Sequence, residues 1–124
     1  MFTPYTFFSA FAAFLGWGGW AYYVNDRVDP AMGVMSGLTQ GLSSFFITFA
    51  TVVMVKIIYD KLYSKISKLL LPAIVIASFL SLTLTFIHMK VGTPMIFLTI
   101  APSLTITFLF CVATAHRLSL NENK

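Results

Sequence analysis

Four long apolar runs, separated by short polar segments, constrain the fold of this chain more than any other feature of its sequence. The runs cover about residues 6–24, 31–58, 69–89 and 94–116. Each is long enough to cross the roughly 30 Å hydrocarbon core of a bilayer as a helix, which rises about 1.5 Å per residue. The sequence therefore predicts an all-α membrane protein whose four transmembrane helices form a single domain over residues 1–124.

The connections between the runs limit both the arrangement of the helices and the classes of function. Residues 25–29, 59–68 and 90–93 join the runs, and such short links place neighbouring helices antiparallel. None of these segments could contain a soluble catalytic domain, a nucleotide-binding fold or a nucleic-acid-binding module. We therefore expect an antiparallel four-helix bundle that acts within the bilayer or at its surfaces, with no nucleic-acid partner.

Composition agrees with this prediction and argues against metal or cofactor chemistry. Only 10% of the residues are charged, the mean hydropathy is +0.87, and an ordinary soluble domain has about 25% charged residues. The one cysteine, Cys111, lies inside an apolar run, which excludes an internal disulfide and a cysteine-based metal cluster. We expect no metal site and no cofactor.

The distribution of basic residues predicts the orientation in the membrane, because cytoplasmic loops are enriched in Lys and Arg. Arg27 and Lys90 fall on one side. Six of the eight basic residues fall on the other, namely Lys56, Lys61, Lys65, Lys68, Arg117 and Lys124. We therefore expect an integral protein of a bacterial-type inner (plasma) membrane, with both termini in the cytoplasm.

The two turns expected on the outer side share a sequence pattern. Residues 27–32 and 90–95 each contain a basic residue, a valine, a capping residue, a proline and a methionine, in that order. Asp29 and Thr93 are predicted helix N-caps, with the following proline at the first helical position. One hypothesis is that two helical hairpins arose by duplication; the alternative is that any such turn selects a cap and a proline.

The second run has a face of small residues that suits close helix packing. At about 100° per residue these positions share one side of a helix, and small residues let helix backbones approach each other. The predicted packing face consists of Gly33, Gly37, Gly41, Ser44 and Thr48. A second interpretation is a polar path through the membrane, for which the candidates are Ser36, Gln40, Ser81 and Thr85.

Basic residues near the outer turns suggest a site for an anion. Arg27, His88 and Lys90 lie close in sequence to two expected helix N-termini, whose dipoles favour negative charge. They could bind the phosphate of an anionic lipid head group. The alternative is that Arg27 and Lys90 extend to ordinary phospholipid while His88 lies at the interface.

The centres of the four runs contain no Asp, Glu, Lys or Arg, which argues against a proton-driven carrier and against catalysis. The leading interpretation is a non-enzymatic accessory or interaction subunit. We expect it to associate with itself, as a homo-oligomer, or with a larger membrane complex, through the glycine face. The alternative is a small oligomeric transporter or channel-like protein for an anionic or lipid-linked solute, and a membrane enzyme ranks third.

Overall fold

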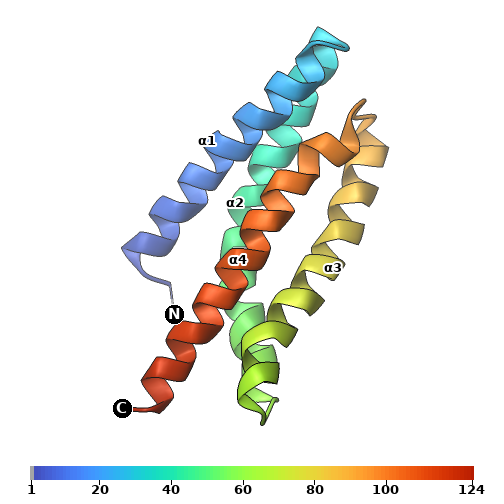
Figure 1. Cartoon of the computed structure of the whole chain (residues 1–124). Helices are drawn as coiled ribbons and strands as arrows, with labels where there is room; N and C mark the ends of the chain where they lie inside the picture. Colours follow the sequence, from blue (N-terminus) through green and yellow to red (C-terminus); the bar gives the residue numbers. More distant parts are fainter. Residues whose placement is uncertain (1) are drawn as a thin grey trace.

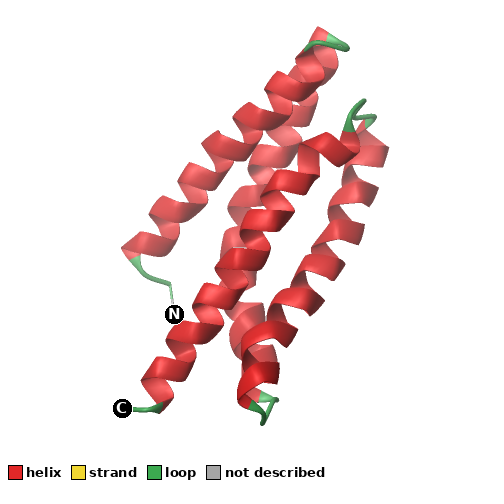
Figure 2. Ribbon diagram, viewed as in Figure 1, coloured by secondary structure: helices red, strands yellow, loops and turns green. Residues whose placement is uncertain are grey.

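The computed structural model describes residues 2–124, which form four helices and no strand. The helices are α1 (Pro4–Asp26), α2 (Pro30–Asp60), α3 (Lys65–Val91) and α4 (Ile96–Glu122). Figures 1 and 2 show them running alternately up and down. The two chain ends and the α2–α3 turn lie towards one end, here named the terminal end, and the other two turns lie at the opposite end.

Three of the four helices, α2, α3 and α4, are long and apolar enough to cross a membrane. The first helix, α1, is long enough but is less clearly a span. Its sequence is rich in Trp, Tyr and Gly, which lower its mean hydropathy although the aromatic rings are large and largely apolar. The structure thus supports a helical membrane protein, most clearly through its last three helices.

Local capping explains where the helices begin and end. Asp29 caps α2 as the sequence predicts, because its carboxylate oxygen Oδ1 accepts the Ala31 N–H at 3.0 Å and Pro30 is the first helical residue. Gly92 ends α3 with φ of 90°, a left-handed conformation that glycine adopts without strain.

The predicted start of the fourth helix is wrong. Thr93 does not cap it, and α4 begins at Ile96 after Met95, whose side chain makes no capping hydrogen bond. Instead, the Thr93 hydroxyl bonds to His88 inside the bundle. A threonine is a good cap only if its hydroxyl is free for the helix N-terminus, and this one also accepts a hydrogen bond from Ser36 of α2.

Glycines bring α1 and α2 into backbone contact. A Cβ atom placed on Gly18 of α1 would lie 3.0 Å from the Gly37 carbonyl oxygen and 3.2 Å from Gly41 Cα. A Cβ on Gly33 would lie 2.7 Å from the Cα atom of Asp26. A Cβ at 2.7 Å would force the backbones apart, and one at 3.0–3.2 Å would require a shift of a few tenths of an ångström, so these glycines determine how closely α1 approaches α2.

The apolar core lies between α2, α3 and α4, towards the terminal end. It consists of Val55, Tyr59, Ala73, Ile76, Leu80, Cys111 and Ala115. Figure 1 shows the first turns of α4, in orange, bent relative to the rest of that helix. Pro102 lies within α4 and lacks the N–H that would continue the hydrogen-bond ladder, which accounts for a bend there.

Candidate functional site

A buried group of polar side chains crosses the interior and links α2, α3 and α4. The His88 Nε2 atom lies 2.8 Å from Gln40 Oε1. The Gln40 amide nitrogen donates to the hydroxyls of Ser103, at 3.1 Å, and Ser44, at 3.2 Å. His88 and Gln40 are both completely buried, so this group replaces the water that their polar atoms would otherwise bind.

The hydrogen-bond directions follow from which atoms can donate. Because the Gln40 nitrogen donates twice, its oxygen accepts, and His88 Nε2 must carry the donated proton. Nδ1 of a neutral His88 then accepts from the Thr93 hydroxyl, 2.6 Å away, and Ser36 donates to Thr93 at 3.0 Å. The chain from Ser36 to Ser103 is therefore complete, and we name these six residues the polar network: Ser36, Gln40, Ser44, His88, Thr93 and Ser103.

A second buried amide joins α1 to the start of α4. Asn25, which is fully buried, accepts the Met95 N–H at 2.9 Å and donates to the Thr99 hydroxyl at 2.8 Å. Nearby, the Trp20 indole N–H donates to the Leu98 carbonyl at 2.8 Å. Both contacts lie towards the opposite end, so α1 and α4 are joined by hydrogen bonds there.

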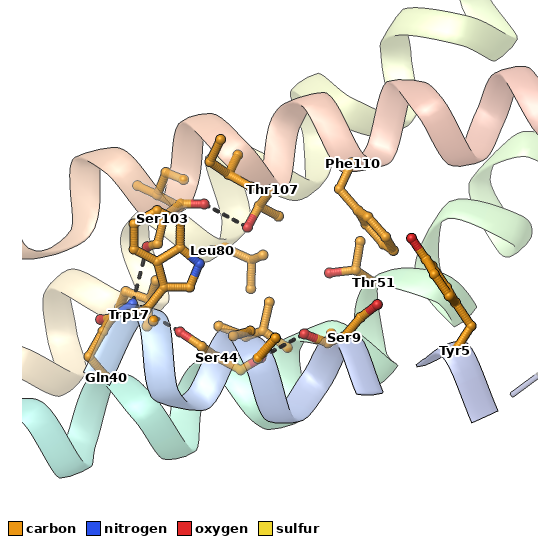
Figure 3. A pocket seen from close by; sticks show the side chains of 18 residues that line it. Tyr5, Ser9, Trp17, Gln40, Ser44, Thr51, Leu80, Ser103, Thr107 and Phe110 are labelled. Atoms are coloured by element: carbon orange, nitrogen blue, oxygen red, sulfur yellow. Dashed lines mark hydrogen bonds between the residues drawn. The ribbon is translucent and has the colours of Figure 1, made fainter. Parts of the chain in front are cut away.

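Towards the terminal end a cavity of about 470 Å³ lies between α1 and α4 and extends to α2 and α3. Figure 3 shows it with Trp17, Gln40 and Ser103 at one end and Tyr5, Thr51 and Phe110 at the other. Three members of the polar network, including Ser44, therefore line one end of it. Most of the remaining lining is apolar or small.

The residues of the predicted packing face contact α1 or line this cavity. Gly33, Gly37 and Gly41 lie against α1, and Ser44 belongs to the polar network. Thr48 donates to the Ser44 carbonyl of its own helix at 2.9 Å and lines the cavity. The glycine face is thus covered within the chain, and another protein could not reach it in this conformation.

The four polar-path candidates do not lie together. Ser36 and Gln40 are buried in the polar network. Ser81 and Thr85 are half-buried and line shallow hollows between α3 and α4 instead. The structure therefore brings together one pair of these residues with His88 and leaves the other pair near the surface.

The three basic candidates also have different environments. Arg27 is exposed, hydrogen-bonds to the Tyr23 hydroxyl and lies over that ring. The Lys90 ammonium, also exposed, is 5.4 Å from the centre of the Phe86 ring. His88 points inward and is fully buried, so it does not share an exposed surface with the two cations.

Several residues that build these sites are missing from the sequence interpretation. Gly18 is the α1 partner of the glycine face, and Asn25 is the inter-helix amide. A usable signal existed for Asn25, because an amide at the end of an apolar run requires partners if it is buried. No such signal marks Gly18, since Gly16 and Gly19 lie within two residues of it and the sequence does not distinguish the three. The structure does, because a Cβ on Gly16 or Gly19 would meet no atom within 4 Å.

A charged cluster closes the terminal end. The Glu122 carboxylate forms an ion pair with the Lys68 ammonium at 2.9 Å and accepts the Tyr59 hydroxyl at 3.0 Å. The Lys68 nitrogen also lies 4.7 Å from the centre of the Tyr59 ring. The cluster joins α2, α3 and α4 where the polar network does not reach.

Among residues 2–124, no group of three or more His, Cys, Asp or Glu side chains is placed to bind a metal ion. Comparisons with known protein families, with curated proteins and with solved structures find no match to this chain. The interpretation of function therefore depends on the geometry alone.

Proposed function

We propose that this chain is a non-enzymatic accessory or interaction subunit of a membrane assembly, acting as a homo-oligomer or within a larger complex. The observation that supports this most is the closure of the polar network. Both amide hydrogens and the carbonyl oxygen of Gln40 have partners within the chain, as do both ring nitrogens of His88. Side chains paired in this way hold helices in position. A catalyst or carrier needs some polar groups whose hydrogen-bonding atoms are available to a substrate.

The proposal includes α1 as a fourth span of an antiparallel bundle, with both termini on the cytoplasmic side of a bacterial-type inner membrane. Its outward side chains support this, because Phe7, Phe8, Phe11 and Leu15 are exposed and suit hydrocarbon. Trp20 and Tyr23 lie towards its other end, where amphipathic rings favour the membrane interface. The six-to-two distribution of basic residues supports the orientation.

Because α1 covers the glycine face, we propose that partners bind the outward faces of the helices. The test places a photoreactive amino acid at one exposed position on each helix, at Phe8, Leu38, Leu82 or Leu109. Cross-linking in intact membranes, followed by mass spectrometry, identifies the neighbours. We expect a specific adduct, either with a second copy or with another chain, from one or two helices, and fully buried Ile76 is the negative control. Adducts with lipid alone from all four positions would contradict the proposal.

The second candidate is a small oligomeric transporter or channel-like protein, and the cavity between α1 and α4 favours it. The cavity lining contains no charged side chain, which suits a lipid-linked or neutral solute better than a free anion. Gln40→Leu separates the two candidates. A transporter that uses Gln40 loses flux while its assembly persists, whereas a structural Gln40 loses stability and assembly together.

A further inference from the structure

The cavity between α1 and α4 is elongated along the bundle. On α2 it extends from Gln40 to Thr51, a distance of about 16 Å at the usual helical rise. Its volume of about 470 Å³ falls within the range of roughly 300–1,000 Å³ typical of small-molecule sites. A slender cavity of this length suits a flexible chain better than a compact solute.

The packing of α1 explains why the cavity is open. Gly18 and Gly37 fix α1 against α2, and Asn25 bonds to the start of α4, and none of these three residues lines the cavity. Ala12, Ala13 and Gly16 are the small residues with which α1 lines the cavity. A Cβ on Gly16 would meet nothing within 4 Å, although this residue lines the cavity. The small side chains therefore leave unfilled space at this position.

One polar atom at the end of the cavity near Tyr5 and Phe110 lacks a partner. Thr51 is 1% exposed, and its hydroxyl oxygen is the one buried side-chain polar atom in residues 2–124 without a hydrogen bond. Other helical threonines, such as Thr48 and Thr107, donate to the carbonyl four residues earlier. Figure 3 shows the Thr51 oxygen directed towards the cavity instead. A buried hydroxyl left unpaired is costly, so it calls for a partner that the chain does not supply.

We propose that this cavity binds the hydrocarbon chain of a neutral single-chain amphiphile, whose hydroxyl or ester oxygen hydrogen-bonds to Thr51. Its polar end lies near Tyr5, at the terminal end, and its tail extends towards Trp17 and Gln40. An ionised head group does not fit here, because the lining has no cation to offset the loss of hydration. The site is independent of the proposed accessory function, which concerns the outward surfaces.

The first experiment locates a probe. Purified protein in nanodiscs is incubated with a long-chain fatty alcohol that carries a diazirine within its chain, then irradiated and analysed by peptide mass spectrometry. We expect adducts on Ala12, Ala13 and Gly16 of α1 and on Ile106, Thr107 and Phe110 of α4, all of which line the cavity. Adducts confined to outward positions such as Phe8 and Leu15 would overturn the proposal.

A matched pair of glycine variants tests occupancy without disturbing the fold. Gly16→Leu fills the cavity, whereas Gly19→Leu adds the same side chain where nothing lies within 4 Å and outside the cavity lining. We expect Gly16→Leu to reduce labelling of Ile106, Thr107 and Phe110 by roughly tenfold, because the added side chain occupies the space of the tail. Gly19→Leu should leave the labelling of these residues unchanged. Equal labelling of the cavity residues in both variants would overturn the proposed binding site.

Variants of Thr51 test the polar contact and the ligand class. Thr51→Val keeps the shape but removes the hydroxyl, and we expect about a three- to tenfold weaker labelling by the alcohol. Thr51→Ser should retain labelling, and a probe with a plain hydrocarbon chain should label both variants equally. Comparing the labelling by an alkyl ester probe with that by the alcohol shows which of the two the site prefers. A probe with an ionised fatty-acid head group should label the protein least. If Thr51→Val leaves labelling by the alcohol and ester unchanged, the assigned contact is wrong.

Discussion

At the scale of single residues, the polar network couples side chains that are far apart in sequence. Gln40 meets His88 of α3 and Ser103 of α4, so one amide aligns three helices at the same depth. Apolar contacts are non-directional, so they specify the register of the helices less strictly than paired polar groups do. A hydrogen bond lost in the bundle interior leaves its partner unpaired, so the network penalises any change of register.

We predict that Gln40→Leu lowers the free energy of unfolding by about 1–3 kcal/mol, because it leaves His88 Nε2 and the Ser103 hydroxyl with fewer partners. The double variant Gln40→Leu/His88→Leu should be more stable than additivity of the single variants predicts, since neither partner is then left unpaired. Unfolding in mixed micelles with increasing denaturing detergent measures both effects. Strictly additive losses would contradict the coupling.

Which side chains hydrogen-bond to each other in the polar network is the part of the site that could not be predicted from sequence alone. The glutamine was recognisable as a buried polar side chain that needs a partner, but nothing in the spacing pairs Gln40 with a histidine 48 residues later. Thr93 shows the same limit from the other side. Its cap position is locally reasonable, and the prediction failed because the hydroxyl bonds to nearby His88 and accepts a long-range hydrogen bond from Ser36.

At the scale of helices, the contact between α1 and α2 depends on close approach of their backbones. The glycine face was visible in the sequence because its spacing of four residues repeats, whereas its partner Gly18 was hidden among neighbouring glycines. Which glycine contacts the other helix depends on the rotation of α1 about its axis. That rotation is a property of the assembled pair and is not encoded in α1 alone.

We predict that Gly37→Ala and Gly18→Ala each destabilise the monomer by about 1–3 kcal/mol, because the new Cβ lies 3.0 Å from a backbone oxygen of the facing helix and forces the helices apart. Gly19→Ala is the control, since its Cβ meets nothing within 4 Å, and it should be neutral or slightly stabilising. Detergent unfolding of the monomer measures the difference. If Gly37→Ala leaves the stability of the monomer unchanged but abolishes its oligomers, the glycine face serves association between chains instead.

At the scale of the whole molecule, the helical class and the lengths of the elements could be predicted from apolar run length alone. The observed helices extend beyond the apolar runs by a few residues at most ends, and the Lys68–Glu122 ion pair joins two of these extensions. The lateral placement of α1 could not be predicted. It packs mainly on α2, and its separation from α4 near the terminal end creates the cavity.

The orientation of the whole chain gives the last prediction, and it also tests whether α1 spans the membrane. Single cysteines are placed at Phe2, Val28 and Tyr63, all of which are exposed. The native Cys111 is completely buried and should not react with a membrane-impermeant maleimide. In intact cells we expect labelling of Val28→Cys alone, because the distribution of basic residues predicts a cytoplasmic location for the other two positions. In permeabilised cells, all three cysteines should be labelled.

Two other patterns would contradict this arrangement. If α1 does not cross the membrane, Phe2→Cys is labelled in intact cells together with Val28→Cys. If the orientation is reversed, Tyr63→Cys is labelled in intact cells and Val28→Cys is not.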